Sequence, residues 1–457
     1  MSKSFFEISR LEHVYRPVGE RVQDFDEVEA PLPQGEIAEL SRRCQNCGIP
    51  FCHAMGCPLH NDVPDMIRAV VMGDWKGAWE RLSETSSFPE FTSRVCPALC
   101  EASCCLEGTG YGATNIRQIE KRIIDTAFER DWVKPLVPVE RRPESVAVIG
   151  AGPAGLAAAA KLNEAGYQVV VYDRQERPGG LLRYGIPCFK LDKALIDRRW
   201  QLLEAAGVQF RGQAAIGRDI AGEYLLRQHD AVIVACGTPV ARDLSKVPGR
   251  DLAGIHLALE YLGGQNRALT GETPSNPICA KGKRVLVIGG GDTGSDCAGT
   301  AFRQGARSIV SIELMPKPPC ERDASTPWPM WPYKLRTSSS IEEGVRRYWN
   351  LNTLRFLGED GHLTGVEVTP VEWKIAPNGR PESFKAVGTP QTIECDLAFL
   401  ALGFLKQTRE QTLASLGLPD EESIVLAGDV ANGPSLVVRA MADGRAAAHR
   451  VRSLLER

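Results

Sequence analysis

The sequence predicts a multidomain fold, in which a helical N-terminal domain precedes two parallel-sheet α/β domains and the second of these is inserted in the first. Eight of the fourteen cysteines lie within the first 105 residues, among segments with helical periodicity. An apolar strand, a glycine-rich turn and an Ala-rich helix begin at Ser145, and the pattern restarts at Lys283. A chain of 457 residues is too long for a single hydrophobic core. We therefore expect domains at 1–140, 144–280 and 281–400, with 401–457 returning to the first α/β domain.

Composition and charge exclude several classes of protein. The formal net charge of −3 gives no basic field for nucleic acid or an anionic membrane surface. No apolar run approaches the roughly 20 residues of a membrane span. The N-terminus, MSKSFFEISRLEHVYRPVGE, has neither the apolar core nor the cleavage site of a secretory signal. We therefore expect a cytoplasmic protein that binds neither nucleic acid nor membrane.

The N-terminal cysteines are spaced as metal ligands, which a reducing compartment favours over disulfides. Seven thiols and one further ligand would complete two four-iron clusters. The alternative is a structural zinc site made by the first four cysteines alone. We interpret Cys105 as a packing residue and the six later cysteines as core or surface thiols. The two groups of closely spaced cysteines are Cys44-x2-Cys47-x4-Cys52-x4-Cys57 and Cys96-x3-Cys100-x3-Cys104.

The first α/β unit carries a dinucleotide-binding fingerprint of the Rossmann type. Its first strand runs directly into Gly150-Ala-Gly152-Pro-Ala-Gly155, which opens a helix. Gly150 permits a tight turn, Gly152 lets a pyrophosphate approach the backbone, and Gly155 lets helix and strand pack closely. The next strand delivers Asp173 where a carboxylate binds ribose hydroxyls. The order of these elements indicates a nucleotide site rather than a structural turn.

A second Rossmann-like fingerprint follows the strand at 284–288. The turn Gly289-Gly-Gly291-Asp292-Thr293-Gly294 opens a helix that runs through Arg303, and the next strand ends at Glu313. Two fingerprints in one chain imply two dinucleotides that face each other, as hydride transfer between a nicotinamide and a flavin requires. That step needs no acid or base side chain, so we name no catalytic residue.

Several longer blocks are more specific than the glycine turns. They are Tyr15-Arg-Pro-Val-x-Glu-Arg, Cys44-x-x-Cys-Gly-Ile-Pro-Phe-Cys-His, Cys57-Pro-Leu-x-Asn, Val95-Cys-Pro-Ala-x-Cys-Glu, Val247-Pro-Gly-Arg-Asp-Leu, Gly289-Gly-Gly-Asp-Thr-Gly-Ser-Asp-Cys and Trp349-Asn-Leu-Asn-Thr-Leu. Together they resemble the small (beta) subunit of bacterial glutamate synthase over nearly the whole chain. The architecture also resembles the electron-input half of dihydropyrimidine dehydrogenase and the larger subunit of NADH-dependent ferredoxin:NADP oxidoreductases.

The resemblance implies which residues hold the cofactors. Matching positions place one 4Fe-4S cluster on Cys44, Cys47, Cys52 and Cys104. The second would be held by Cys57, Cys96 and Cys100, with Glu120 as its eighth, non-cysteine ligand; the alternative for Glu120 is a solvated helix carboxylate. FAD would lie on the first unit, in contact with Ala154, Gly180, Leu181, Lys190, Gly428, Asp429 and Leu436.

The function implied by the resemblance is electron input. NAD(P)H on the second unit would reduce FAD, and electrons would pass through the clusters to a large subunit that carries FMN and iron–sulfur centres. That subunit makes two glutamates from glutamine and 2-oxoglutarate. One alternative is an oxidoreductase of the same architecture that serves a ferredoxin-type or pyrimidine-reducing partner. The other is a non-catalytic module that senses NAD(P)H or binds a partner.

The choice between NADPH and NADH depends on few side chains. Glu313 stands where an acid binds a free 2′-hydroxyl and repels a 2′-phosphate. Bacterial chains that resemble this one carry a Glu in the same block and are mostly NADPH-dependent. We expect NADPH, with the phosphate reached by Arg303, Arg307 or Lys317. The chain departs from the family pattern at Val430-Ala-Asn-Gly-Pro, at Arg439 and in a shortened stretch before Leu426.

Overall fold

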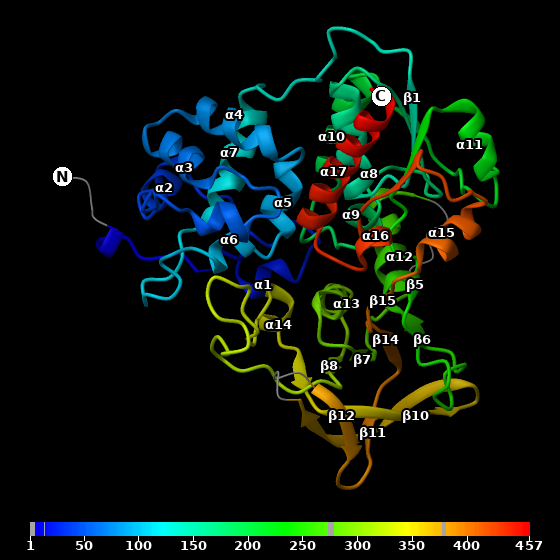
Figure 1. Cartoon of the computed structure of the whole chain (residues 1–457). Coiled ribbons are helices and arrows are strands. Elements are labelled where there is room, and N and C mark those ends of the chain that lie inside the picture. Colours follow the sequence, from blue (N-terminus) through cyan, green and yellow to red (C-terminus); the bar gives the residue numbers. More distant parts are fainter. Residues whose placement is uncertain (1–4, 13, 273–277, 377–380) are drawn as a thin grey trace.

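The computed structural model describes residues 5–12, 14–272, 278–376 and 381–457. Figure 1 shows a helical domain beside a first α/β unit, with a second α/β unit below and an antiparallel sheet at the far end. This arrangement confirms the predicted fold class. Within the described residues, no helix has both the length and the apolar character needed to span a bilayer.

The helical domain packs short helices around one apolar core. In α3, residues Val63, Met66, Ile67 and Val70 are buried at the i, i+3, i+4, i+7 spacing of an amphipathic helix. They pack with the buried isoleucines of α7. The elements are η1 (Phe5–Glu7), α1 (Val18–Arg21), α2 (Gln34–Ser41), η2 (Cys52–Gly56), α3 (Val63–Val71), α4 (Trp75–Thr85), α5 (Pro89–Val95), α6 (Leu99–Ala102) and α7 (Ile116–Glu129).

The first α/β unit is built on a parallel sheet in the order β16-β4-β1-β2-β3. Helices α8 and α17 cover one face of β1, while α11 and α15 cover the other, which explains its continuous apolar sequence. The strands are β1 (Ser145–Ile149), β2 (Gln168–Tyr172), β3 (Gln209–Arg211), β4 (Ala231–Val234) and β16 (Ile424–Leu426). The helices are α8 (Pro153–Glu164), α9 (Leu181–Tyr184), α10 (Lys193–Ala205), α11 (Gly222–Gln228), α15 (Arg409–Leu416), α16 (Asp429–Asn432) and α17 (Val437–Leu455).

The second α/β unit has its own parallel sheet, in the order β6-β14-β7-β8-β9. The chain passes between the units where β5 (Val240–Ala241) pairs antiparallel with β15 (Phe404–Leu405). Strand β6 precedes residue 281, where we expected the unit to begin, yet it pairs with β14. The elements are β6 (Ile255–Leu257), α12 (Ala258–Thr270), β7 (Arg284–Ile288), α13 (Asp292–Arg303), β8 (Ser308–Ile312), α14 (Ser339–Glu342), β9 (Arg346–Tyr348) and β14 (Leu397–Leu400).

An antiparallel sheet that we did not predict covers one face of the second parallel sheet. It contains β10 (Leu351–Glu359), β11 (His362–Ile375), β12 (Pro381–Ala386) and β13 (Gln391–Glu394), with β11 paired to the other three. Phe356, Val366 and Val368 of this sheet pack on Leu286 and Ile288 of β7. The opposite face of β7 is covered by α12 and α13.

Candidate cofactor sites

The first cavity brings together the four thiols expected to hold one cluster. Cys44, Cys47, Cys52 and Cys104 all line it, and the hollow spans about 390 Å³ including its mouth. Three of the thiols lie between α2 and α3, whereas Cys104 follows α6. Cys52 also begins η2, a π-helical turn, which is a conformation often found at functional sites.

The second cavity brings together Cys57, Cys96, Cys100 and Glu120, in a hollow of about 280 Å³. Glu120 is buried on α7, so it is not a solvated helix carboxylate. The Asn61 amide donates to Glu120 Oε1 at 2.9 Å and itself accepts a hydrogen bond from a threonine hydroxyl at 2.8 Å. This chain of bonds fixes the carboxylate against the thiols.

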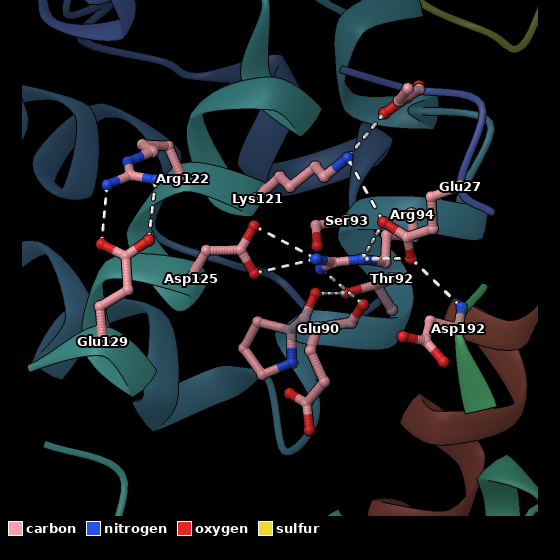
Figure 2. A network of polar contacts seen from close by, with 12 residues as sticks. Glu27, Glu90, Thr92, Ser93, Arg94, Lys121, Arg122, Asp125, Glu129 and Asp192 are labelled. Carbon is pink, nitrogen blue, oxygen red and sulfur yellow. Dashed lines mark hydrogen bonds and ion pairs between the residues drawn. The ribbon is translucent and has the colours of Figure 1, made fainter. Parts of the chain in front are cut away.

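Ion pairs hold the two helices that position the second cavity (Figure 2). Arg94, two residues before Cys96, donates Nε to Glu27 at 2.8 Å and Nη2 to Asp125 of α7 at 3.0 Å. These groups are mostly buried, so loss of one partner would leave an unpaired charge in a medium of low dielectric constant. The network therefore sets α5 against α7, and with them Cys96 against Glu120.

Burial disfavours the charged form of several candidate ligands in the metal-free chain. It raises the pKa of Cys52 and Cys57 to about 12 and the pKa of Cys96 to about 11. It also raises the pKa of Glu120 to about 7. A bound cation is what would hold these groups in the anionic form that ligates metal, because metal binding releases the protons.

The spacing of these groups tests the zinc alternative. Across the parts of the chain that the structure describes, no three Cys, His, Asp or Glu side chains are close enough together to hold one metal ion. The two expected donor sets instead line two separate cavities, which is the arrangement expected for two four-iron clusters. The donor sets therefore favour two clusters over one zinc ion.

Cys105 differs from its predicted role as a packing residue. It is exposed, lines the first cavity, and its Sγ lies 3.3 Å from Cys47 Sγ. Cys104, its neighbour, is buried. Successive side chains of a tight turn point in different directions, which places one thiol inside and the next at the surface.

The glycines of the first turn have different roles in the structure. Gly150 has φ of +107°, and a Cβ there would overlap a backbone carbonyl of the neighbouring strand. A Cβ on Gly155 would overlap the carbonyl oxygen of Gly150. At Gly152, by contrast, the nearest atom to a Cβ lies 4.0 Å away. The space above Gly152 is therefore open, where a pyrophosphate is expected at the N-terminus of α8.

Two further glycines approach this turn from opposite segments. Gly180 has φ of +51°, and a Cβ there would lie 2.7 Å from Gly152 Cα. Gly428 has φ of +74°, and its Cβ would lie 2.7 Å from the Ala154 Cβ. The loop after β2 and the segment after β16 thus both converge on the first turn, as expected for residues along one bound cofactor.

The remaining residues expected to contact FAD lie around this point. Leu181 begins α9 and is half-exposed, and Leu436 is the residue before α17. Asp429 accepts a hydrogen bond from the Ser435 hydroxyl at 2.8 Å, which closes the turn between α16 and α17. Their roles as ligands stay predictions.

The second glycine turn repeats the design of the first. Gly289 has φ of +122°, and a Cβ on Gly294 would overlap the Gly289 carbonyl. A Cβ on Gly291 would meet nothing within 4 Å. Asp292 and Thr293 form the first turn of α13 and lie beside this open space.

The acids after the second strands face the two turns in the same way. Asp173 Oδ2 accepts from the Ala151 amide at 2.7 Å, and Glu313 Oε2 accepts from the Gly290 amide at 2.5 Å. Each carboxylate also accepts from an amide two residues further along its own segment. Both acids therefore lie at the carboxyl ends of their strands, bonded to the glycine turns, and their contacts with a nucleotide stay predictions.

Lys190 lies between the two units. Its ammonium pairs with the Asp296 carboxylate. Asp296 is the fifth residue of α13, the helix that the second glycine turn opens. Because Lys190 belongs to the loop that follows α9 of the first unit, this ion pair joins that loop to α13 of the second unit. The expected contact of Lys190 with FAD stays a prediction.

Two of the arginines expected to read a 2′-phosphate are misplaced for that role, and the expectation is corrected. Arg303 is at the end of α13 opposite the glycine turn, where both its Nη atoms bond Glu343 and its side chain is 0% exposed. Arg307 precedes β8, about 20 Å of strand away from Glu313. Ligands of parallel sheets bind beyond the carboxyl ends of strands, so neither arginine is in reach.

Lys317 and Arg347 lie near the carboxyl end of β8, the edge of the sheet where a nucleotide is expected. The Lys317 ammonium and the Arg347 guanidinium lie over the Trp349 ring, at 5.3 and 4.8 Å from its centroid. Trp349 follows β9, the neighbour of β8, so this pair of cations stands beside Glu313. Arg347 was not predicted from the sequence; its place two residues before the Trp349 block was the signal that could have found it.

Comparisons with known proteins agree with this organisation. Residues 21–132 match the family described as dihydropyrimidine dehydrogenase domain II, 4Fe-4S cluster, and residues 144–444 match pyridine nucleotide-disulphide oxidoreductase. The glutamate synthase (NADPH) small chain of Mycobacterium tuberculosis is 43% identical and covers 95% of this chain and 91% of its own length. The chain belongs to the glutamate synthase small-chain family. This confirms the resemblance found in the sequence.

Further relatives match this chain over nearly its whole length. The Escherichia coli glutamate synthase (NADPH) small chain is 32% identical and covers 99% of this chain and 98% of its own length. The glutamate synthase (NADH) of Saccharomyces cerevisiae is 38% identical over 99% of this chain, which is 22% of that longer protein. Among solved structures, Mycobacterium tuberculosis FprA in complex with NADPH has a TM-score of 0.54 and 17% identity, and covers 69% of this chain and 85% of its own. That likeness shows a shared fold of the α/β units.

Proposed function

We propose that this small chain is the electron-input subunit of a glutamate synthase. When bound, FAD and two 4Fe-4S clusters would supply hydride acceptance from NAD(P)H and electron transfer toward a large subunit that converts glutamine and 2-oxoglutarate to two glutamates. The residues of the chain itself hold these groups, orient them and exclude water. No side chain is required to donate or remove a proton.

One observation carries the proposal: the same chain has two cavities lined by the expected cluster ligands and two glycine turns that are open to a nucleotide. Val438, in the first turn of α17, lines the second cavity beside Cys57 and Cys100. The same helix packs against α8, which begins at the first glycine turn. The residues that line the first cavity all belong to the helical domain. We infer that the second cavity adjoins the flavin position and that the first cavity lies further out.

NADPH is the proposed reductant. A 2′-phosphate at the end of β8 would lie beside Lys317 and Arg347, whose charges oppose that of Glu313. Glu313 is already bonded to two backbone amides, so its carboxylate is turned toward the glycine turn. A guanidinium grips phosphate with two parallel hydrogen bonds, which suits Arg347 to the discriminating contact.

The large subunit is the proposed partner, with docking at the mouth of the first cavity. Ile49 lines that cavity and is 73% exposed, which is unusual for an isoleucine beside a buried site. An apolar contact there would exclude water around an electron-transfer path. We place this assembly in the cytoplasm, in keeping with the thiol-rich ligand sets, which need a reducing compartment.

We propose four segments as the domain division: 1–140, 144–280, 281–400 and 401–457, with one adjustment. The pairing of β6 with β14 supports a second unit that begins near β5, so 240–280 would belong to it. The first unit then comprises residues before β5 and after β15.

The test begins with protein purified anaerobically. We expect about eight irons, about eight labile sulfides and about one FAD per chain, and rapid reduction of an artificial acceptor by NADPH. Addition of the large subunit should yield glutamate from glutamine and 2-oxoglutarate. Tightly bound zinc without labile sulfide would contradict the cluster assignment. Turnover with the artificial acceptor and none with the large subunit would favour another acceptor, and no turnover at all would favour a sensing module.

A further inference from the structure

A closed loop of the second α/β unit reaches across to the helical domain (Figure 1). We call residues 319–335 the crossing loop. The Leu335 amide donates to the Pro319 carbonyl at 2.6 Å and closes its base. Within it, Arg322 Nη1 donates to the carbonyls of Thr326 and Met330 at 3.1 and 2.5 Å. The crossing loop is therefore bonded internally, like a compact surface loop with adjacent ends.

Trp328 lies where the crossing loop meets the first cavity. Its indole N–H donates to the Cys104 carbonyl at 3.1 Å, and its ring centroid lies 4.8 Å from that of Phe51. Cys104 and Phe51 both line the first cavity, and Phe51 directly precedes Cys52. One side chain thus contacts the two segments that carry two of the four expected ligands.

Further bonds attach the crossing loop to the same turn of the helical domain. Arg322 Nη2 donates to the Ala102 carbonyl at 3.0 Å, and the Ser103 hydroxyl donates to the Pro329 carbonyl at 2.8 Å. Ala102 ends α6, and the last carbonyls of a helix have no partner within it. The crossing loop supplies donors to two carbonyls at this helix end, those of Ala102 and Cys104.

The far end of this segment is fixed beside the second glycine turn. The Ser338 and Ser295 hydroxyls are 2.5 Å apart, and Ser295 lies in the first turn of α13. Arg336 stacks on Trp331 at 3.9 Å and donates to the Pro332 carbonyl at 2.5 Å. The crossing loop is thus bonded to the turn that carries Cys104, and the residues that follow the loop are bonded to α13.

We propose that the crossing loop is a clamp for the first cluster, with Trp328 as the positioning residue that holds Cys104 and Cys52 in place. The inference rests on the proposed function, since it concerns the retention of a cluster. It means that a loop of the second α/β unit supports the segments of the helical domain that carry Cys104 and Cys52. Trp328 bonds to Cys104 itself, whereas the bonds described for the crossing loop reach none of Cys57, Cys96, Cys100 and Glu120, so the second cluster should not depend on the clamp.

The test compares Trp328→Ala and Trp328→Phe with Met330→Ala in the full chain loaded with FAD and iron. Met330 is exposed on the same loop, and its backbone carbonyl remains for Arg322. With an iron chelator under anaerobic conditions, Trp328→Ala should release about four of its eight irons at least about tenfold faster than the parent chain. The EPR signal of one cluster should weaken with that release, while FAD content and the other cluster signal stay unchanged.

Trp328→Phe should fall between the two, because it keeps the contact with Phe51 and loses the bond to the Cys104 carbonyl. Met330→Ala should match the parent chain. Release of iron from Trp328→Ala at the parental rate would overturn the clamp, and so would simultaneous loss of all iron and FAD, which would indicate general damage. A parent chain without labile sulfide would instead overturn the proposed function, so the two failures are distinguishable.

Discussion

Arg303 and Glu343 form an ion pair in which both side chains are 0% exposed. Arg21 donates Nε to the same Glu343 carboxylate at 2.9 Å, from the helical domain. Arg303 ends α13 and Glu343 follows α14, so one buried carboxylate ties α1 to the second α/β unit. The arginine that the sequence pattern suggested for a phosphate is therefore part of an interface between units.

Replacement of Arg303 should act on stability and not on nucleotide binding. Arg303→Met leaves the Glu343 carboxylate with Arg21 alone, and breaking a buried pair costs about 3 kcal/mol. We expect a lower unfolding temperature for the FAD-loaded chain, with the KM for NADPH unchanged. Arg307→Ala, at an exposed position, is the control and should alter neither quantity. A selective rise in the KM for NADPH would return Arg303 to the nucleotide site.

The cations over Trp349 should determine the choice of nucleotide. Lys317→Ala combined with Arg347→Ala should raise the KM for NADPH about tenfold, a loss of about 1.4 kcal/mol, and leave that for NADH nearly unchanged. The reason is that both charges lie beside Glu313, at the carboxyl end of β8. Steady-state kinetics with both nucleotides is the measurement. An equal loss with both would show that these side chains do not read the phosphate.

Gly152 and Gly291 offer probes that affect a ligand without affecting the fold. A Cβ at Gly291 meets nothing within 4 Å, and at Gly152 the nearest atom lies 4.0 Å away. Gly152→Val should therefore fold and lose FAD, whereas Gly291→Val should keep FAD and lose its reduction by NADPH. Absorbance spectra of the flavin before and after NADPH addition distinguish these outcomes. If Gly291→Val empties the flavin site, the two units have been assigned in the wrong order.

Ile49 should matter to the partner and not to the artificial acceptor. Ile49→Asp places a charge at the mouth of the first cavity, where an apolar contact is proposed. Glutamate formation with the large subunit should fall at least about tenfold, while NADPH-driven reduction of the artificial acceptor persists. Met72→Asp, at an exposed apolar position on the end of α3, is the matched control. Equal activity of Ile49→Asp with the large subunit would place docking elsewhere.

The sequence was sufficient for the parallel sheets because their signals are local. Strand, glycine turn and helix follow one another within about thirty residues, so spacing alone predicts both units. The antiparallel sheet was missed although its hairpin has a local signal. Asp360 and Gly361 have φ of +49° and +77°, the left-handed values of the turn that Asp-Gly favours between two strands. The long, uneven apolar pattern of β11 concealed that signal.

In the candidate sites, too, the features with a local sequence signal were predicted and those that depend on distant contacts were not. Cysteine spacing and family resemblance together were sufficient to sort the eight expected ligands into two sets, and each set lines a cavity of its own. Arg303 and Arg307 were misjudged because proximity in sequence to β8 was taken for proximity to its carboxyl end. Trp328 could not be found from the sequence, since its partner Cys104 lies 224 positions away. Contacts of that range follow only from how the units pack.

Glu120 provides the sharpest test of the second cavity. Glu120→Ala removes the carboxylate that faces Cys57, Cys96 and Cys100 and leaves the Asn61 amide without its acceptor. We expect about four irons per chain in place of about eight, with FAD still bound and still reduced by NADPH. Because the second cavity adjoins the flavin-side helix α17 through Val438, transfer beyond the flavin should stop even though the first cluster is intact.

Glu120→Gln distinguishes a role of this side chain as an iron ligand from a role in packing alone. Glu120→Gln keeps an oxygen that can accept from Asn61 and coordinate iron, so it should retain more of the second cluster than Glu120→Ala. Glu129→Ala, on the same helix at an exposed position, is the control and should keep about eight irons. Iron and sulfide analysis together with EPR gives the readout. If Glu120→Ala still holds about eight irons, the eighth ligand must be another group, and the buried carboxylate would then serve only to hold Asn61 and the loop that carries Cys57.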